Sequence, residues 1–155
     1  MNNLVLRRAT QDDIWEVYRL ANSPDIRSVS FHPRHISREE HEMWYQQKLT
    51  DKNCIFMIIS NKAKDFIGSI RFDLTKPNTY LVSVYLAKIF RGYGIGTQAI
   101  FQASKMILTN NPAIKIKAQI KKSNIGSYKS FLNAGYREVK KSSIYKKAYI
   151  EMIFP

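Results

Sequence analysis

Three strand-like segments follow one another in the middle of the chain, and their succession limits the folds that this sequence can adopt. They cover residues 54–60, 66–74 and 79–86, and the turns between them span only residues 61–64 and 76–78. Turns this short join antiparallel neighbours, because a parallel connection needs about a dozen residues or more. We therefore expect a mixed sheet, in which these adjacent strands are not all parallel.

Helices are predicted on both sides of this block of strands. Thr10-Gln-Asp-Asp13 and Ser37-Arg-Glu-Glu40 each begin a helix with a capping residue and acids in the first turn; these helices end near residues 21 and 49. Apolar residues at helical spacing predict a long helix from about Gly94, and a shorter helix follows over 124–134. Further strands are expected near 4–6, 114–120, 136–141 and 144–154, so the predicted order is β-α-α-β-β-β-α-β-α-β-β.

Positive charge is concentrated in the second half of the chain. The 155 residues carry 25 Lys and Arg against 12 Asp and Glu, a formal net charge of +13. Residues 1–73 hold 11 basic and 10 acidic side chains, whereas residues 74–155 hold 14 basic side chains and only Glu138 and Glu151. This asymmetry indicates either a polyanionic partner for the second half or a solvated basic face.

Other bulk features exclude whole classes of protein. The single cysteine, Cys54, rules out an internal disulfide and a cysteine-based zinc site. His32, His35 and His41 lack a carboxylate partner at metal-site spacing, so no metal is predicted. No stretch approaches the ~20 apolar residues of a membrane span and the first residues do not resemble a signal peptide, so we expect a cytoplasmic protein without a membrane partner.

Three of the six glycines lie at positions 92, 94 and 96, between a predicted strand and the long helix. A glycine-rich turn that enters a helix presents unpaired backbone N–H groups and the positive end of the helix dipole, which suits a phosphate. The segment is neither a dinucleotide fingerprint nor a P-loop, since the latter needs Gly-Lys-Ser/Thr. The alternative interpretation is a tight strand-to-helix connection without a ligand.

Two motifs resemble those of one known family. Arg91-x-x-Gly94-x-Gly96 resembles the acetyl-CoA signature of the GNAT superfamily of N-acetyltransferases. Asn124-Ile-Gly-Ser127, followed by Phe131 and Gly135-Tyr136, resembles a second helix of that family, and the order of elements agrees over essentially the whole chain. The resemblance implies one acyl-CoA N-acyltransferase domain over residues 1–155 with an α/β (α+β) GNAT fold. Its mixed, mostly antiparallel sheet would have about seven strands, flanked by about four helices and splayed between the fourth and fifth strands.

The resemblance further implies acetyl-CoA (coenzyme A) as the cofactor, held in the gap between two central strands. Backbone groups near Leu86 would hold the pantetheine, the N–H groups of residues 91–97 the pyrophosphate, and Asn124 the pantetheine arm. Coenzyme A carries about four negative charges, which suits the basic half of the chain. The cofactor-binding residues implied are Val84, Leu86, Arg91, Gly92, Tyr93, Gly94, Ile95, Gly96, Thr97, Asn124, Ser127 and Phe131.

In such enzymes a neutral amine attacks the thioester directly, which requires an oxyanion donor, an acid for the thiolate and a base for the ammonium. Leu86 is the predicted catalytic position for the donor, through a backbone N–H. Asp73 is the predicted base, with a histidine acting through water, or a purely structural carboxylate, as the alternatives. Many relatives place a tyrosine seven residues after the motif Asn, but Phe131 stands there, so Tyr128 is the predicted acid. Tyr85 and Tyr136 remain alternatives.

The nearly neutral first half is expected to bind the acceptor. It resembles acetyltransferases that act on nucleotide-linked amino sugars in nonulosonic-acid (pseudaminic-type) pathways, through the segments 22–27, 30–32, 36–41 and 68–73 with Trp44 and Lys48-Leu49. The resemblance implies an anionic small-molecule acceptor such as a UDP-amino sugar. Its diphosphate would pair with Arg27 and Arg71, and its ring would stack on Trp44 or Phe31. The substrate-binding residues implied are Arg27, Phe31, His32, His41, Trp44 and Arg71.

Two other functions stay open at this point. One is an acetyltransferase for protein N-termini, of the ribosomal-protein type. The other is a non-catalytic module that binds acetyl-CoA or nucleic acid; Tyr145-Lys-Lys-Ala-Tyr149 is the one stretch that interleaves aromatic and basic residues, so nucleic acid is not favoured. A polyamine acceptor is disfavoured by the net charge, and both a monomer and a homodimer are compatible with the sequence.

Overall fold

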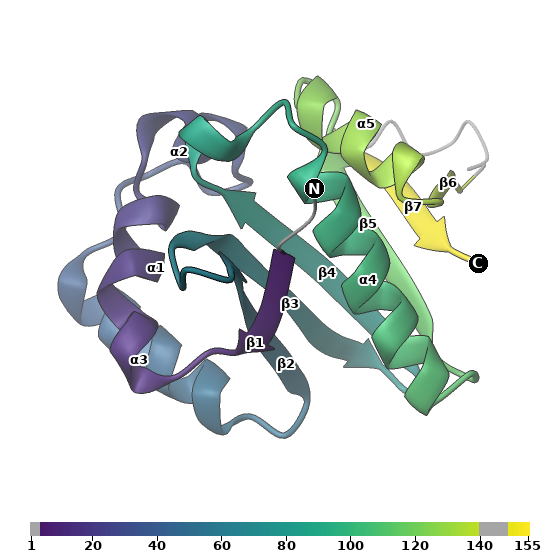
Figure 1. Cartoon of the computed structure of the whole chain (residues 1–155), viewed down its shortest axis with the longest axis horizontal. Coiled ribbons are helices and arrows are strands. Elements are labelled where there is room, and N and C mark those ends of the chain that lie inside the picture. The colour runs from purple at the N-terminus through teal and green to yellow at the C-terminus, as the bar shows by residue number, and fades with distance from the viewer. Residues whose placement is uncertain (1–3, 140–148) are drawn as a thin grey trace.

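The strands in the described part of the chain form one seven-stranded mixed sheet, in the order β1-β2-β3-β4-β5-β7-β6 (Figure 1). The computed structural model describes residues 4–139 and 149–155. The strands are β1 (Leu4–Arg8), β2 (Cys54–Asn61), β3 (Phe66–Lys76), β4 (Thr79–Leu86), β5 (Lys115–Lys121), β6 (Arg137–Glu138) and β7 (Tyr149–Phe154). The predicted mixed sheet is confirmed. Parts of the segments predicted at 136–141 and 144–154 lie outside the described residues.

Five α-helices flank the sheet in the described part of the chain, with short 3-10 turns at Gln11–Asp13 and Lys88–Phe90. They are α1 (Ile14–Ala21), α2 (Pro24–Val29), α3 (Arg38–Thr50), α4 (Ile95–Asn110) and α5 (Ile125–Asn133). The sequence predicts four of them and misses α2. Pro24 was expected to stop a helix, but it occupies the first turn of a new one, where its missing N–H costs no hydrogen bond.

The predicted helix start at Ser37 shows how local sequence sets an element. The Glu40 N–H donates to Ser37 Oγ at 3.1 Å, and the Ser37 N–H donates to the Glu40 carboxylate at 3.0 Å. This reciprocal capping box satisfies two N–H groups that the first helical turn leaves unpaired. It therefore fixes the start of α3, which packs against the sheet.

Both faces of the sheet are covered, and β2 shows why. Phe56 and Ile58 belong to the core cluster of α1 and α3, whereas Met57 and Ile59 belong to the larger cluster of α4 and α5. Successive strand residues point to opposite faces, so the continuous apolar run of β2 is buried on both faces of the sheet. The first helices thus cover one face of the sheet and α4 with α5 the other.

The sheet opens in its middle. β4 and β5 are parallel and pair only from Thr79 opposite Lys115 to Val82 opposite Ala118. Beyond this point β4 continues to Leu86 and β5 to Lys121 without further pairing between them. The predicted splay between the fourth and fifth strands is confirmed. Within the described residues, no helix is long and apolar enough to cross a membrane.

Candidate active site

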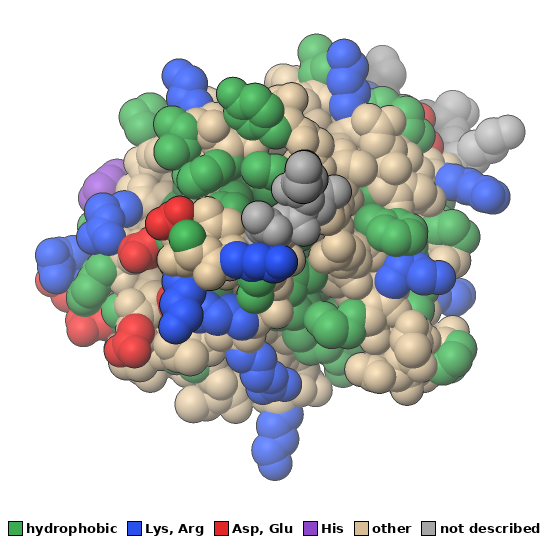
Figure 2. Space-filling model, viewed as in Figure 1, with side chains coloured by type: hydrophobic (Ala, Val, Ile, Leu, Met, Phe, Trp, Pro, Cys, Tyr) green, Lys and Arg blue, Asp and Glu red, His purple; other side chains and the backbone are tan. Residues whose placement is uncertain are grey.

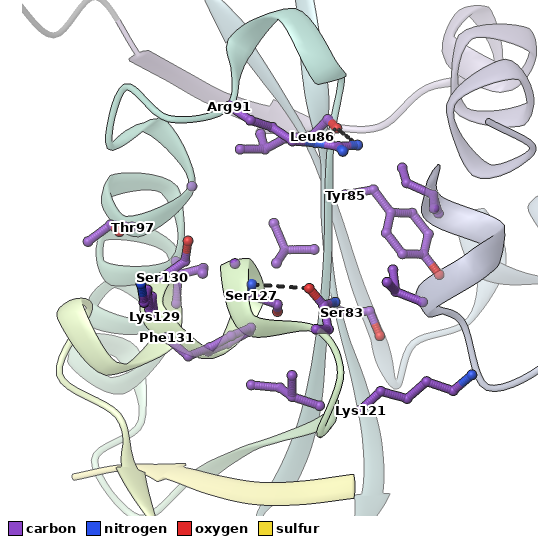
Figure 3. Close-up of a pocket in the computed structure, with 18 of the residues that line it drawn as sticks. Ser83, Tyr85, Leu86, Arg91, Thr97, Lys121, Ser127, Lys129, Ser130 and Phe131 are labelled. Carbon is purple, nitrogen blue, oxygen red and sulfur yellow. Dashed lines mark hydrogen bonds between the residues drawn. The ribbon is translucent and has the colours of Figure 1, made fainter. Parts of the chain in front are cut away.

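A cavity of about 570 Å³ occupies the gap between β4 and β5 (Figure 3). Its walls come from the end of β4, the glycine-rich loop with the start of α4, the end of β5, α5, and α2 with the residues after it. Of the predicted cofactor-binding residues, the lining includes Val84, Leu86, Arg91, Gly92, Gly94, Gly96, Thr97, Asn124, Ser127 and Phe131. Tyr93, which is 79% exposed, and Ile95 do not line it.

The glycine-rich loop forms an open cradle at one end of the cavity. Gly92 and Gly94 have φ angles of +84° and +77°, and a Cβ at either position would meet no atom within 4 Å. The first hydrogen bond of α4 runs from the Gln98 N–H to the Gly94 carbonyl at 3.0 Å, so the N–H groups before Gln98 lack a partner within the helix. No acid lies in this first turn. The cradle fits the pyrophosphate of coenzyme A.

Gly96 has a different role in the same loop. A Cβ there would lie 3.1 Å from a Leu86 methyl and 3.6 Å from Ser130 Oγ. Glycine therefore lets the start of α4 approach both the end of β4 and α5. This close packing brings the three walls of the cavity together.

The Arg91 side chain joins the loop to its surroundings. Its Nε and Nη2 groups donate to the Leu86 carbonyl at 3.0 and 2.7 Å, and its Nη1 group pairs with the Asp25 carboxylate of α2. The guanidinium thus satisfies a backbone carbonyl at the end of β4 that would otherwise pair with a neighbouring strand. It also fastens α2 to the loop, which the sequence motif alone does not show.

Helix α5 presents its start and one face to the cavity. The Ser127 N–H donates to Asn124 Oδ1 at 3.2 Å, so the motif asparagine caps α5 (Figure 3). Phe131 is 2% exposed and meets the edge of the Tyr136 ring, with ring centroids 4.9 Å apart. It therefore closes the apolar end of the cavity.

The candidate acids differ in their access to the cavity. Tyr128 does not line it, and its hydroxyl donates to Glu138 at 3.3 Å. Tyr136 is buried and hydrogen-bonded to Ser104 Oγ at 2.8 Å, and burial raises its pKa far above the ordinary value. Tyr85 lines the cavity and points to the side of β4 away from α4 and α5 (Figure 3). Among the described lining residues it is the one tyrosine.

Asp73, the predicted base, lies outside the cavity in an ion-pair cluster. Its carboxylate accepts hydrogen bonds from Lys48 Nζ and Arg71 Nε, both at 2.7 Å. Burial pushes the pKa of Asp73 up, but the charge of Arg71 and the hydrogen bond from Lys48 outweigh it and hold the pKa below its usual value. A carboxylate with a lowered pKa is a poor proton acceptor. Its geometry is that of a structural carboxylate.

Most of the predicted acceptor residues do not line the cavity. The Arg27 guanidinium donates to the carbonyls of Ala21 at 2.7 Å and His32 at 3.0 Å, and Arg71 lies over the Trp44 ring, 4.9 Å from its centroid. Neither arginine lines the cavity, so neither is placed to pair with a diphosphate there.

The histidines are also elsewhere. His41 is 1% exposed, and its Nε2–H donates to the Ile14 carbonyl at 2.8 Å within a cluster of aromatic rings. His32 is exposed and, like Trp44, does not line the cavity. The resemblance implied these positions as substrate-binding residues, but the side chains of His41 and Trp44 pack in the core between α1, α3 and the sheet. The described residues hold no group of three or more potential metal ligands of the His, Cys, Asp and Glu types.

Phe31 is the exception, because it does line the cavity. It is 46% exposed, and its ring meets the edge of the Tyr149 ring with centroids 5.7 Å apart. This contact joins the segment after α2 to the start of β7. The sequence does not predict the neighbouring wall, formed by Asp25, Ile26, Val29 and Ser30, because it does not predict α2 itself.

The charge asymmetry of the sequence is visible in space. On the face shown in Figure 2, the acidic side chains gather on the side formed by the first helices, with Lys and Arg among them, whereas the charged side chains visible around α4 are Lys and Arg. Four charged residues are among those that line the cavity: Asp25, Arg91, Lys121 and Lys129. Asp25 is paired with Arg91, so the remaining lining charges are positive.

Comparison with known proteins gives a family and a fold. The family model described as "Acetyltransferase (GNAT) domain" matches residues 3–137. Spermidine N-acetyltransferase from Vibrio cholerae, solved with CoA and spermine, is 18% identical with a TM-score of 0.82, and the match covers 97% of this chain and 93% of that chain. A domain from Methanocaldococcus jannaschii is 20% identical with a TM-score of 0.83, covering 97% of this chain and 96% of that chain.

A third similar structure is AAC(6')-Ib in complex with ribostamycin and coenzyme A. It is 16% identical with a TM-score of 0.82, and the match covers 99% of this chain and 93% of that chain. At such identities these likenesses show a common fold. No curated protein sequence matches this chain.

Proposed function

This chain belongs to the family of acetyltransferase (GNAT) domains, and from that premise we propose that its acceptor is the primary amine of a nucleotide-linked amino sugar. The membership makes the chain an acetyl-CoA-dependent N-acetyltransferase. The identity of the acceptor goes beyond this membership and is our proposal. The charge of the cavity carries this proposal.

Among the described residues that line the cavity, Asp25 is the one acid, and its carboxylate is paired with Arg91. A polycationic acceptor needs carboxylates that are free to hold its ammonium groups, since charges at a binding site must be complementary. Two of the similar structures are named for spermidine and aminoglycosides, which are polycations. This cavity instead offers unpaired positive charge, which favours an acceptor with an anionic group.

The rim of the cavity supports a ring-shaped acceptor. Phe31 lines the cavity and forms an edge-to-face pair with Tyr149 of β7, which lies behind it. An exposed aromatic face at this position suits stacking against a nucleobase or a sugar. This pair replaces Trp44, whose ring is already covered by Arg71.

The residues of the cavity fit direct transfer. Acetyl-CoA, when bound, supplies an activated acetyl thioester. The cradle at Gly92–Thr97 would hold the pyrophosphate through backbone N–H groups, and Phe131 and Leu86 provide apolar walls beside it. Backbone N–H groups of residues 84–86 that face the unpaired side of β4 would stabilise the oxyanion.

Proton transfer is assigned to Tyr85 in this proposal. Its side chain lies on the acceptor side of β4 and lines the cavity (Figure 3). Its hydroxyl can relay a proton from the acceptor ammonium through water. Tyr128 is placed less well for this, because it lies outside the lining and is bonded to Glu138.

An acceptor panel tests the proposal. Release of the coenzyme A thiol is measured with UDP-linked amino sugars, an N-terminal peptide, spermidine and an aminoglycoside at equal concentrations. We expect kcat/KM to be highest for a UDP-amino sugar. Turnover of the polycations or the peptide with no turnover of any UDP-amino sugar would refute the proposed acceptor and leave the acetyltransferase assignment intact.

A further inference from the structure

Lys121 lies at the end of β5, where the two central strands have separated. The parallel pairing of β4 and β5 stops at Val82 opposite Ala118, so Lys121 is three residues beyond the last pair. On its other side it pairs with Tyr149 of β7, the residue whose ring contacts Phe31. Lys121 therefore lies next to the aromatic rim of the cavity.

The side chain of Lys121 extends toward the acceptor side. Figure 3 shows it pointing away from α4 and α5, on the side of β4 to which Tyr85 also points. The cofactor cradle at Gly92–Thr97 lies on the opposite side of this strand gap, with α4 and α5. The ammonium group is thus separated from the place where the pyrophosphate of the cofactor would bind.

Other cations close to this face of the sheet are already paired. Arg71 and Lys48 share the Asp73 carboxylate, and Lys117 Nζ lies 3.3 Å from Glu151. Lys121 has no ion pair or side-chain hydrogen bond with any described residue, although its side chain is only partly exposed. A partly buried ammonium group beside an open cavity is placed to take an anionic ligand.

We infer that Lys121 determines acceptor specificity by binding the anionic group, a diphosphate or phosphate, of the incoming amine. This inference rests on the proposed function and adds the residue that recognises the acceptor's charge. The phosphate oxygens accept hydrogen bonds from Lys121 Nζ, while the ring of the acceptor lies against Phe31 and the amine reaches the end of β4. Arg27 and Arg71, which the sequence suggested for this role, are occupied elsewhere.

A binding experiment separates this role from catalysis. UDP is titrated by calorimetry into protein saturated with coenzyme A, so that the cofactor cradle is filled and only the acceptor side is free. Lys121→Met should weaken UDP binding by about tenfold or more, because a charge-assisted hydrogen bond is lost. Lys121→Arg should retain most of the affinity.

Lys122 offers a matched control. It is the next residue, is exposed and does not line the cavity, so Lys122→Met removes the same charge without touching the site. UDP affinity should then stay within about twofold, since an exposed charge at this distance is largely screened. Equal weakening by both substitutions would overturn the inference, because it would show an effect of net charge alone.

Acceptor kinetics give the second measurement. The ratio of kcat/KM for a phosphorylated amine to that for its unphosphorylated counterpart, for instance glucosamine 6-phosphate against glucosamine, should fall about tenfold or more in Lys121→Met. An equal loss for both acceptors would mark Lys121 as structural and overturn the inference.

The two proposals fail in different ways. Turnover of a UDP-amino sugar that is the same in the wild type and in Lys121→Met refutes the role of Lys121 and keeps the proposed function. A preference for glucosamine 6-phosphate that depends on Lys121, without turnover of any UDP-amino sugar, keeps the role of Lys121 and refutes the nucleotide-linked acceptor. No preference for an anionic acceptor in the wild type refutes both.

Discussion

Substitution of Gly68 on β3 should disturb the active site, because it would displace the end of the neighbouring strand β4. Gly68 is buried on β3, where it pairs with Leu86 of β4. A Cβ at this position would lie 2.1 Å from the Tyr85 carbonyl oxygen and 3.0 Å from the Leu86 Cα atom. Because both contacts are with backbone, no side-chain rotation can relieve them.

The displacement can be worked out from these distances. The shortest ordinary contact between a carbon and a carbonyl oxygen is about 3.3 Å, so Gly68→Ala must push the end of β4 away by about 1.2 Å. Overpacking of this kind costs about 1–3 kcal/mol of unfolding free energy. For a chain of this length each kcal/mol lowers the Tm by about 2–4 °C, so we expect a decrease of about 2–12 °C.

Activity should suffer more than stability, because the displaced residues are those to which we assign the oxyanion donor and the proton relay. A misplacement of about 1 Å can lower the rate by about 100-fold. The assays are thermal unfolding, calorimetric titration with coenzyme A, and thiol release with the best acceptor of the panel. Gly126→Ala is the stability control, because its added Cβ would meet no atom within 4 Å and alanine favours the helix.

The control should raise the Tm slightly while Gly68→Ala lowers it. A Gly68→Ala variant with wild-type Tm and wild-type kcat/KM would show that the sheet absorbs the methyl group elsewhere. A lower Tm with full activity would show that the end of β4 does not set the geometry of the reaction. Either result refutes the reasoning.

Three further predictions concern single side chains. In a thiol-release assay, Tyr85→Phe should lower kcat at least tenfold with unchanged coenzyme A affinity, whereas Tyr128→Phe should keep most of the activity. A larger loss of kcat in Tyr128→Phe than in Tyr85→Phe would contradict the assignment of the proton relay to Tyr85. Asp25→Asn should raise the KM for the acceptor while the Tm changes by less than about 3 °C, since the ion pair with Arg91 is partly exposed and Arg91 keeps its bonds to the Leu86 carbonyl. Loss of coenzyme A binding in this variant, without a raised KM for the acceptor, would contradict this. Burial lowers the pKa of His41 below its ordinary 6.5, so the unfolded chain takes up a proton first and the free energy of unfolding falls as the pH decreases below about 6.5. Urea unfolding between pH 7 and 5 should show that this free energy changes less with pH in His41→Phe than in the wild type. An equal change in both proteins would rule out His41 as the cause.

Features encoded within a few residues were predicted correctly from the sequence. The Ser37 capping box needs only Glu40, and the turn at Gly92–Gly96 needs only its own glycines and the helix that follows. The short turns between β2, β3 and β4 likewise follow from local sequence. These local patterns also carry the family resemblance, which is why the fold was predicted over nearly its whole length.

Contacts between distant residues were not predictable in the same way. Asp25 and Arg91 are 66 residues apart, and no periodicity links them. Arg27, Arg71 and Trp44 have the chemistry of a binding site, but only the packing of α2 and α3 shows that their polar and aromatic groups are used within the fold. The sequence around Lys121 shows only the alternation of apolar and polar residues that is usual for a strand. Lys121 reaches the cavity because β4 and β5 separate before this position.

The placement of α2 has a consequence for how such an enzyme can acquire a new substrate. One wall of the cavity comes from a continuous stretch of eight residues, 24–31, while the remaining lining residues lie between positions 82 and 133. Exchanging this short segment for another of equal length would alter the choice of amine in one step, provided that a carboxylate remains at position 25 to meet Arg91. Within the proposed function, part of the substrate range can therefore change through a short stretch of the gene that leaves the glycine-rich loop untouched.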